Sequence, residues 1–186
     1  MIKNDMLYYL AIFVICLIVA NLSSSIYASF MIYTDVALGL LVVFIGLAVG
    51  RSAFAFTNLF SAENNELTIN EDNYTTRLSV SSFMSALLSI YGSVQGDILY
   101  NTAMYDVEND QMLEEPILSY FEVFTAPFQF LIYDPVGYIL LEIDYIIFYF
   151  QSLSTDGMYG VVSIGFLAAA VYFGYNSAWG TRYSWF

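Results

Sequence analysis

The chain has 186 residues, of which 59% are hydrophobic and 19% aromatic, and its formal net charge is −13. A soluble domain of this length cannot bury so much apolar surface, so the composition indicates an integral membrane protein in a lipid bilayer. The negative charge excludes a nucleic-acid-binding protein, which needs a basic surface. The chain has no His and one Cys, so it offers no imidazole ligand and no Cys-based cluster. We expect no cofactor and no metal site.

The first sixty residues predict an N-terminal transmembrane hairpin. Residues 6–22 form an apolar run of nearly the 20 residues that cross a bilayer. A run of three serines, Ser23 to Ser25, is expected to begin the connection. Residues 36–56 are expected to form the second span, in which Arg51 is the main polar residue. Residues 61–77, which are polar and acidic, are then expected to be an exposed loop.

Residues 78–186 predict a C-terminal helical membrane region. In residues 78–96, apolar side chains recur every three or four positions with serines between them. This pattern is typical of an amphipathic helix whose serine face packs against protein; a helix lying on the membrane surface is the alternative. Residues 97–116 are expected to form a second acidic loop. Residues 158–175 form the last apolar run, and their small side chains indicate close helix neighbours.

Residues 127–151 are long enough to cross a bilayer, yet they carry Glu142 and Asp144 in their apolar centre. Each acidic side chain at mid-membrane costs about 2.5–3.5 kcal/mol on insertion scales, and no Lys or Arg lies within the stretch. We therefore expect both carboxyl groups to face protein, water or another subunit. Two residues apart, they point about 200° apart on a helix and do not form one paired site. Pro135 is expected to kink the stretch at Asp134.

The predicted fold is an all-α polytopic membrane protein with five transmembrane helices and two acidic loops. Residues 117–126 are too short to span a bilayer alone. A sixth span arises if residues 117–133 cross as a separate helix. All four basic residues then fall on one side of the membrane, as the positive-inside rule favours.

The sequence around the two central acids resembles a known family. Residues 141–145, LEIDY, precede an apolar run, Pro127-Phe128 stands about four turns earlier, and Tyr175, Gly180 and Trp185 follow in order. This pattern resembles chain 3 of the proton-pumping NADH:ubiquinone oxidoreductase, respiratory complex I, which carries an acid-x-acid step in its second helix. The sequence departs from that family because the acids are in swapped order. The Cys of the family's loop motif is also absent, and the first two spans have no counterpart.

The resemblance implies a membrane subunit of a mitochondrial-type respiratory complex in the mitochondrial inner membrane. Its partners would be other membrane subunits of a large complex, in proximity to a quinone. The chain would support proton-coupled electron transfer, with Glu142, Asp144 and Glu122 as candidates for a proton path.

The residues themselves show no nucleophile with a base, no phosphate-binding glycine loop and no metal cluster, so we do not expect catalysis by the chain alone. One alternative is an accessory structural membrane subunit of a respiratory or ATP-synthase assembly, in which the acids only make subunit contacts. Another alternative is a small ion transporter or channel. Transporters often contain an internal repeat, and the sequence shows none.

Overall fold

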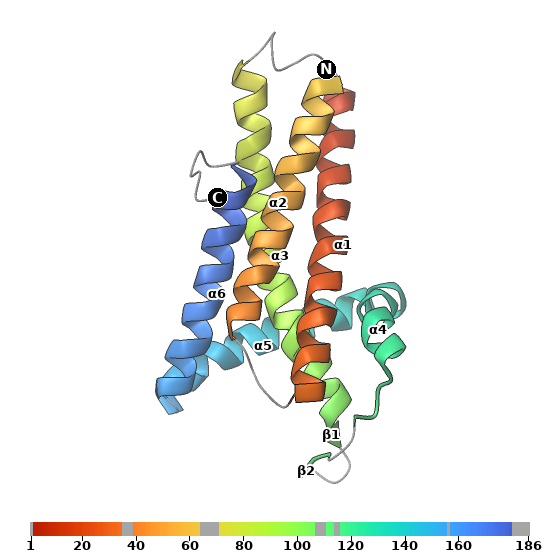
Figure 1. Ribbon diagram of the computed structural model, residues 1–186, viewed down its shortest axis with the longest axis vertical. Helices are drawn as coiled ribbons and strands as arrows, with labels where there is room; N and C mark the ends of the chain where they lie inside the picture. The colour runs from red at the N-terminus through yellow and green to blue at the C-terminus, as the bar shows by residue number, and fades with distance from the viewer. Residues whose placement is uncertain are drawn as a thin grey trace.

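Figure 1 shows a computed structural model of the chain, which describes residues 2–34, 39–63, 71–106, 111–113, 116–155 and 157–179. Within these residues the chain forms six α-helices and one short two-stranded sheet. The predicted all-helical architecture is confirmed, apart from these two strands of two residues each.

Four helices lie side by side as a bundle: α1 (Ile2–Thr34), α2 (Gly39–Glu63), α3 (Glu71–Met104) and α6 (Gly157–Ala178). In Figure 1, α1 and α3 run downwards and α2 and α6 run upwards. Each of α1 and α2 buries one stripe of residues spaced three or four apart, which is the spacing of a single helix face. The buried residues of these stripes are Tyr8, Ile12, Cys16, Ala20, Val42, Ile45, Val49 and Ala53.

The serine run does not end α1, which continues to Thr34. The hydroxyl groups of Ser24 and Ser25 each donate a hydrogen bond of 2.9 Å to the carbonyl oxygen of Asn21, one turn earlier. Serine side chains that bond back to the preceding turn are compatible with a continuous helix. The predicted connection at this point is therefore wrong, and the first helix is longer than its apolar run.

Among the described residues, three helices are long and apolar enough to cross a membrane by length and composition: Met6–Thr34, Leu40–Phe60 and Val161–Ala178, within α1, α2 and α6. The chain is thus plausible as a polytopic membrane protein, whereas a count of five or six spans is not confirmed. The predicted serine face of α3 is confirmed except at Ser79, which is only half-buried. The buried serines are Ser82, Ser85, Ser89 and Ser93, together with Ser81, which was not predicted.

The flanking helices extend into both predicted loops. The helix α2 continues to Glu63 and α3 begins at Glu71, so only residues 64–70 of the first loop lie outside the described residues. In the second, α3 extends to Met104. The strand β1 (Tyr105–Asp106) then pairs antiparallel with β2 (Gln111–Met112), with Tyr105 opposite Met112. Residues 107–110 and 114–115 lie outside the described residues.

Residues 127–151 do not form one span. The chain forms α4 (Tyr120–Tyr133) and α5 (Pro135–Thr155), separated at Asp134, so the predicted kink is a complete break. The backbone N–H of Gly137 donates a hydrogen bond of 3.0 Å to the Asp134 carboxylate. Asp134 therefore caps a helix whose first residue is a proline, a favourable start. Since α4 has only 14 residues, about 21 Å of helix, it is also too short for the sixth span.

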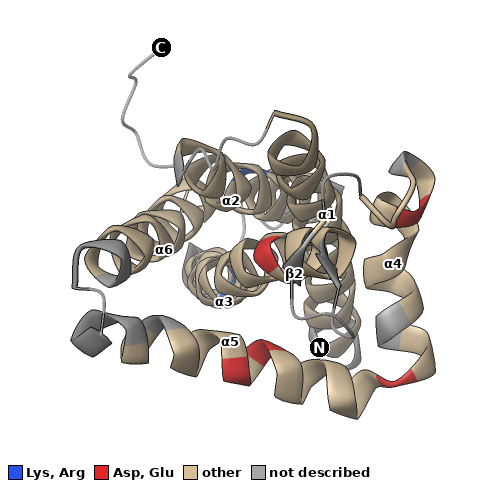
Figure 2. Cartoon of the chain, turned by 90° about the horizontal axis from the view of Figure 1, so that it is seen from below, with Lys and Arg blue, Asp and Glu red and all other residues tan. Residues whose placement is uncertain are grey.

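The direction of α5 corrects the prediction further, because α5 lies crosswise over one side of the lower part of the bundle instead of along it (Figure 1 and Figure 2). It packs against α6 and α3, and α4 packs against α1. The acid-containing helix therefore lies across one side of the bundle.

Candidate functional site

Glu142 is buried between α5 and the bundle. Its side chain is 6% exposed, and both carboxyl oxygens are shielded from solvent without a hydrogen bond of standard geometry. Asp144, two residues further along α5, is exposed. The two acids thus lie on different sides of the helix, as their spacing predicts, and only Glu142 faces protein.

Two tyrosines lie beside Glu142. Tyr138 is one turn earlier on α5 and is buried, and its ring lies edge-on to the ring of Tyr91 in α3, with centroids 6.5 Å apart. The Tyr91 hydroxyl donates a hydrogen bond of 2.8 Å to the side-chain oxygen of Asn21 in α1. Both tyrosines interact electrostatically with Glu142. A polar line from Asn21 through Tyr91 and Tyr138 to Glu142 therefore crosses three helices.

Gln95 adds a further buried polar group to α3. It is fully buried, and neither its amide oxygen nor its amide nitrogen has a hydrogen-bond partner. It follows Tyr91 by one helical turn, so the two side chains share a face of α3. Tyr91, Gln95 and Tyr138 were not predicted as site residues. The signal in the sequence is the spacing of four between Tyr138 and Glu142, which places them on one face of α5.

Glu122 does not join this cluster through its hydrogen bonds, which are local. It lies exposed in the first turn of α4, where its carboxylate accepts hydrogen bonds from the Ser119 backbone N–H (2.8 Å) and hydroxyl group (2.7 Å). The Glu122 N–H donates to the Ser119 hydroxyl oxygen at 3.4 Å. This is a capping box, and it lowers the pKa of Glu122. The geometry assigns Glu122 a helix-capping role.

The basic residues do not collect at one end of the spans. Arg51 is exposed and is the thirteenth of the 25 residues of α2, close to the middle of the candidate span Leu40–Phe60. Arg77 is buried near the start of α3, and its guanidinium group lies 5.1 Å from the ring centres of both Tyr8 and Phe60. Arg182 lies outside the described residues. The arrangement in which all four bases occupy one side therefore does not hold for Arg51.

The part of the chain that the structure describes contains no group of three or more Cys, Asp or Glu side chains able to hold a metal ion. The site is a single carboxyl group held beside two tyrosines at the side of a helical bundle. These features fit a helical membrane protein with a buried acid beside its bundle. No family model matches the chain, and no curated protein or solved structure matches it.

Proposed function

We propose that this chain is a membrane subunit of a larger assembly, without a catalytic centre of its own, in which Glu142 binds and releases a proton. The observation that carries the proposal is a carboxyl group 6% exposed with neither oxygen hydrogen-bonded. Burying a charged carboxylate costs far more free energy than burying the neutral acid. A buried carboxylate with a structural role normally pairs with a Lys or Arg side chain or accepts hydrogen bonds from N–H donors. Glu142 has neither, so a change of protonation is its best-supported role.

The neighbouring hydroxyl groups suit this role. A tyrosine hydroxyl can donate a hydrogen bond to a carboxylate and accept one from a carboxylic acid, so Tyr138 can accompany either state of Glu142. Tyr91 is fixed by its hydrogen bond to Asn21 and by its ring contact with Tyr138. A chain of such groups polarises along its length. The cluster therefore offers Glu142 partners whose hydrogen bonds reverse when it gains or loses a proton.

Arg51 supports membership of an assembly. A positive charge exposed near the middle of a membrane span costs about 2.5–3.5 kcal/mol on insertion scales. Such residues normally face protein or a water-filled space. A carboxylate on a neighbouring subunit would offset this cost. Large apolar side chains are also exposed on α4 and α5, among them Tyr133, Val136, Ile139, Leu140 and Phe150. These surfaces fit contact with neighbouring membrane subunits or lipid.

A finer proposal places the chain in the mitochondrial NADH:ubiquinone oxidoreductase, and it rests on the sequence resemblance alone. The crosswise position of α5 differs from the membrane-crossing second helix that the resemblance implies. The accessory structural subunit remains the alternative, with Glu142 serving only subunit contacts. The proton-binding role and the structural role of Glu142 predict different effects of replacing its carboxyl group with an amide.

The test uses the assembly that co-purifies with the chain in mild detergent, reconstituted into sealed vesicles. Glu142→Gln should lower the rate of proton movement by the assembly at least about tenfold, because an amide cannot carry the proton. Asp144→Asn is the matched control, since it removes an exposed acid from the same helix and should leave the rate unchanged. If Glu142→Gln assembles normally and pumps at the unaltered rate, the structural alternative is correct. If the purified chain moves ions alone, it is a transporter.

A further inference from the structure

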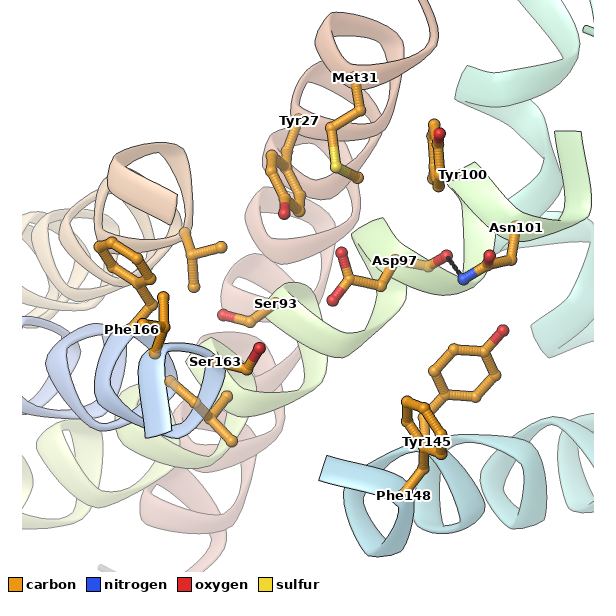
Figure 3. Close-up of a pocket in the computed structure, with 13 residues that line it drawn as sticks. Tyr27, Met31, Ser93, Asp97, Tyr100, Asn101, Tyr145, Phe148, Ser163 and Phe166 are labelled. Carbon is orange, nitrogen blue, oxygen red and sulfur yellow. Dashed lines mark hydrogen bonds between the residues drawn. The ribbon is translucent and has the colours of Figure 1, made fainter. Parts of the chain in front are cut away.

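A cavity of about 340 Å³ lies at the lower end of the bundle, where α1, α2, α3, α5 and α6 meet. Its volume is at the lower end of the range of small-ligand pockets. Glu142 does not line it. Figure 3 shows side chains converging on this cavity from α1, α3, α5 and α6. Five of the lining residues are aromatic, namely Tyr27, Tyr100, Tyr145, Phe148 and Phe166.

Asp97 supplies the charge of the cavity. It is the one acidic side chain among the lining residues, none of which is Lys or Arg. In Figure 3 its carboxylate extends from α3 into the space between Tyr27 and Ser93, and Tyr145 approaches from the opposite side. One turn later, the Asn101 amide donates a hydrogen bond of 2.9 Å to the Asp97 carbonyl oxygen. The cavity therefore combines one negative charge with aromatic walls.

This combination selects a particular kind of ligand. Aromatic faces carry negative potential and attract organic cations, above all quaternary ammonium groups, which have no N–H to donate. A hard metal ion would need several oxygen ligands around it, and the lining provides a single carboxylate. An anionic ligand would be repelled by Asp97. We propose that this cavity binds a quaternary ammonium cation, with Asp97 as its counter-ion and the tyrosine and phenylalanine rings as its walls.

The depth of the cavity fits such a ligand at a membrane surface. Tyr27 and Met31 lie within the last two turns of α1, Val42 lies in the first turn of α2, and Asp97 lies two turns from the end of α3. At 1.5 Å per residue these positions are about 5–11 Å from the helix ends. Because α1 has 33 residues, about 50 Å of helix, its ends would extend past a hydrocarbon core of about 30 Å into the headgroup region of a bilayer that it spans. The cation therefore comes either from the choline headgroup of a phospholipid or from free choline, whose ammonium chemistry is the same.

The test uses the full-length chain purified in a maltoside detergent, which carries no choline. In one arm, choline chloride is titrated and its binding heat is measured. In the other, native mass spectrometry compares retention of phosphatidylcholine with that of phosphatidylglycerol and phosphatidylethanolamine. We expect preferential retention of phosphatidylcholine. Retention without binding of free choline assigns the headgroup as the source, whereas equal affinity for both assigns the free cation.

Variants connect the binding to this cavity. Asp97→Asn should weaken it about tenfold, and Tyr145→Leu should weaken it several-fold while Tyr145→Phe keeps it, because the ring face and not the hydroxyl contacts the cation. Asp144→Asn removes an exposed acid outside the cavity and should bind as the wild type does. Helix content measured by circular dichroism identifies misfolded variants, and the Tyr145 pair tests the cavity if Asp97→Asn misfolds. The proposal is overturned if neither choline nor phosphatidylcholine binds, if the three lipids are retained equally and free choline does not bind, or if folded Asp97→Asn and Tyr145→Leu chains bind normally.

Discussion

Gly46 of α2 packs directly against the backbone of Ala170 in α6. A Cβ atom built at Gly46 would lie 2.9 Å from both the Cα atom and the carbonyl carbon of Ala170, and closer still to its carbonyl oxygen. One turn further, a Cβ atom at Gly50 would lie 2.5 Å from the carbonyl oxygen of Gly174. Backbone atoms cannot rotate away as a side chain can. The absence of side chains at these two glycines is therefore what brings α2 and α6 together.

Gly46→Ala should destabilise the bundle by about 1–3 kcal/mol, because the added methyl group forces the two helices apart. The fraction folded is measured in mixed detergent as sodium dodecyl sulfate is raised. Gly165→Ala is the matched control on α6, since a Cβ atom there meets nothing within 4 Å. It should be neutral or slightly stabilising, because Ala favours helix over Gly. Equal effects of the two substitutions would show that α2 and α6 are not in close contact.

Tyr8→Phe tests a buried hydroxyl cluster at the end of the bundle opposite the cavity. The Tyr8 hydroxyl lies 2.7 Å from the Thr57 hydroxyl and 2.6 Å from the Ser81 hydroxyl, which joins α1, α2 and α3. Thr57 and Ser81 also donate to carbonyl oxygens of their own helices, so neither loses all its partners in the variant. We therefore expect a loss of only about 1 kcal/mol in unfolding free energy.

The same detergent titration measures this loss, and Tyr172→Phe provides the comparison. Tyr172 is exposed on α6, so removing its hydroxyl should change stability by less than about 0.5 kcal/mol. A loss well above 2 kcal/mol for Tyr8→Phe would mean that the hydroxyl leaves a buried group without any partner. No loss would mean that the three hydroxyl groups do not meet.

The capping box of α4 predicts a dependence on pH. Hydrogen bonds from Ser119 hold the pKa of Glu122 below its ordinary value of 4.5. Because the folded pKa is the lower one, the charged form stabilises the helix start. That stabilisation is complete above the ordinary value and is lost as pH falls through the lowered pKa. Backbone amides in the first turn of α4 should therefore exchange with deuterium faster in acid, after correction for intrinsic rates.

Glu122→Gln is the control for this dependence. Glutamine keeps an acceptor oxygen for Ser119 but cannot titrate, so its α4 amides should show little change between neutral and acidic pH. If the wild type and the variant respond to acid alike, Glu122 does not act through its charge. The amides of α2 serve as an internal reference, because α4 packs mainly against α1, α3 and α5.

Much of the bundle could be predicted because span length and hydrophobic period are local properties of the sequence. The serine face of α3 follows from spacing alone. By contrast, Ser24 and Ser25 were interpreted as a helix end, since serine also favours turns; their hydroxyl groups instead bond back to Asn21. Such a choice between turn and helix depends on what surrounds the residue, which a single sequence does not contain.

The direction of α5 could not be predicted for a related reason. The Asp134-Pro135 step indicated a bend, but the angle after a break is set by packing against α3 and α6. Glu142 was identifiable because an acid in an apolar stretch is costly wherever the helix points. Tyr91 was not, because it approaches Glu142 only when α5 crosses the side of α3. Glu142 could thus be predicted from its own chemistry, whereas its partner Tyr91 is determined by the tertiary structure.

Glu142→Met separates a functional acid from a structural one. A buried carboxyl group without hydrogen bonds costs free energy, and methionine fills a similar volume with apolar atoms. We expect the variant to be more stable than the wild type by about 1–2 kcal/mol in the detergent titration, while proton movement by the assembly falls as in Glu142→Gln. Asp144→Asn should change neither, since that side chain is exposed. A destabilised Glu142→Met chain would show instead that the carboxyl group holds α5 against the bundle. The proton-binding role of Glu142 would then lose its physical basis.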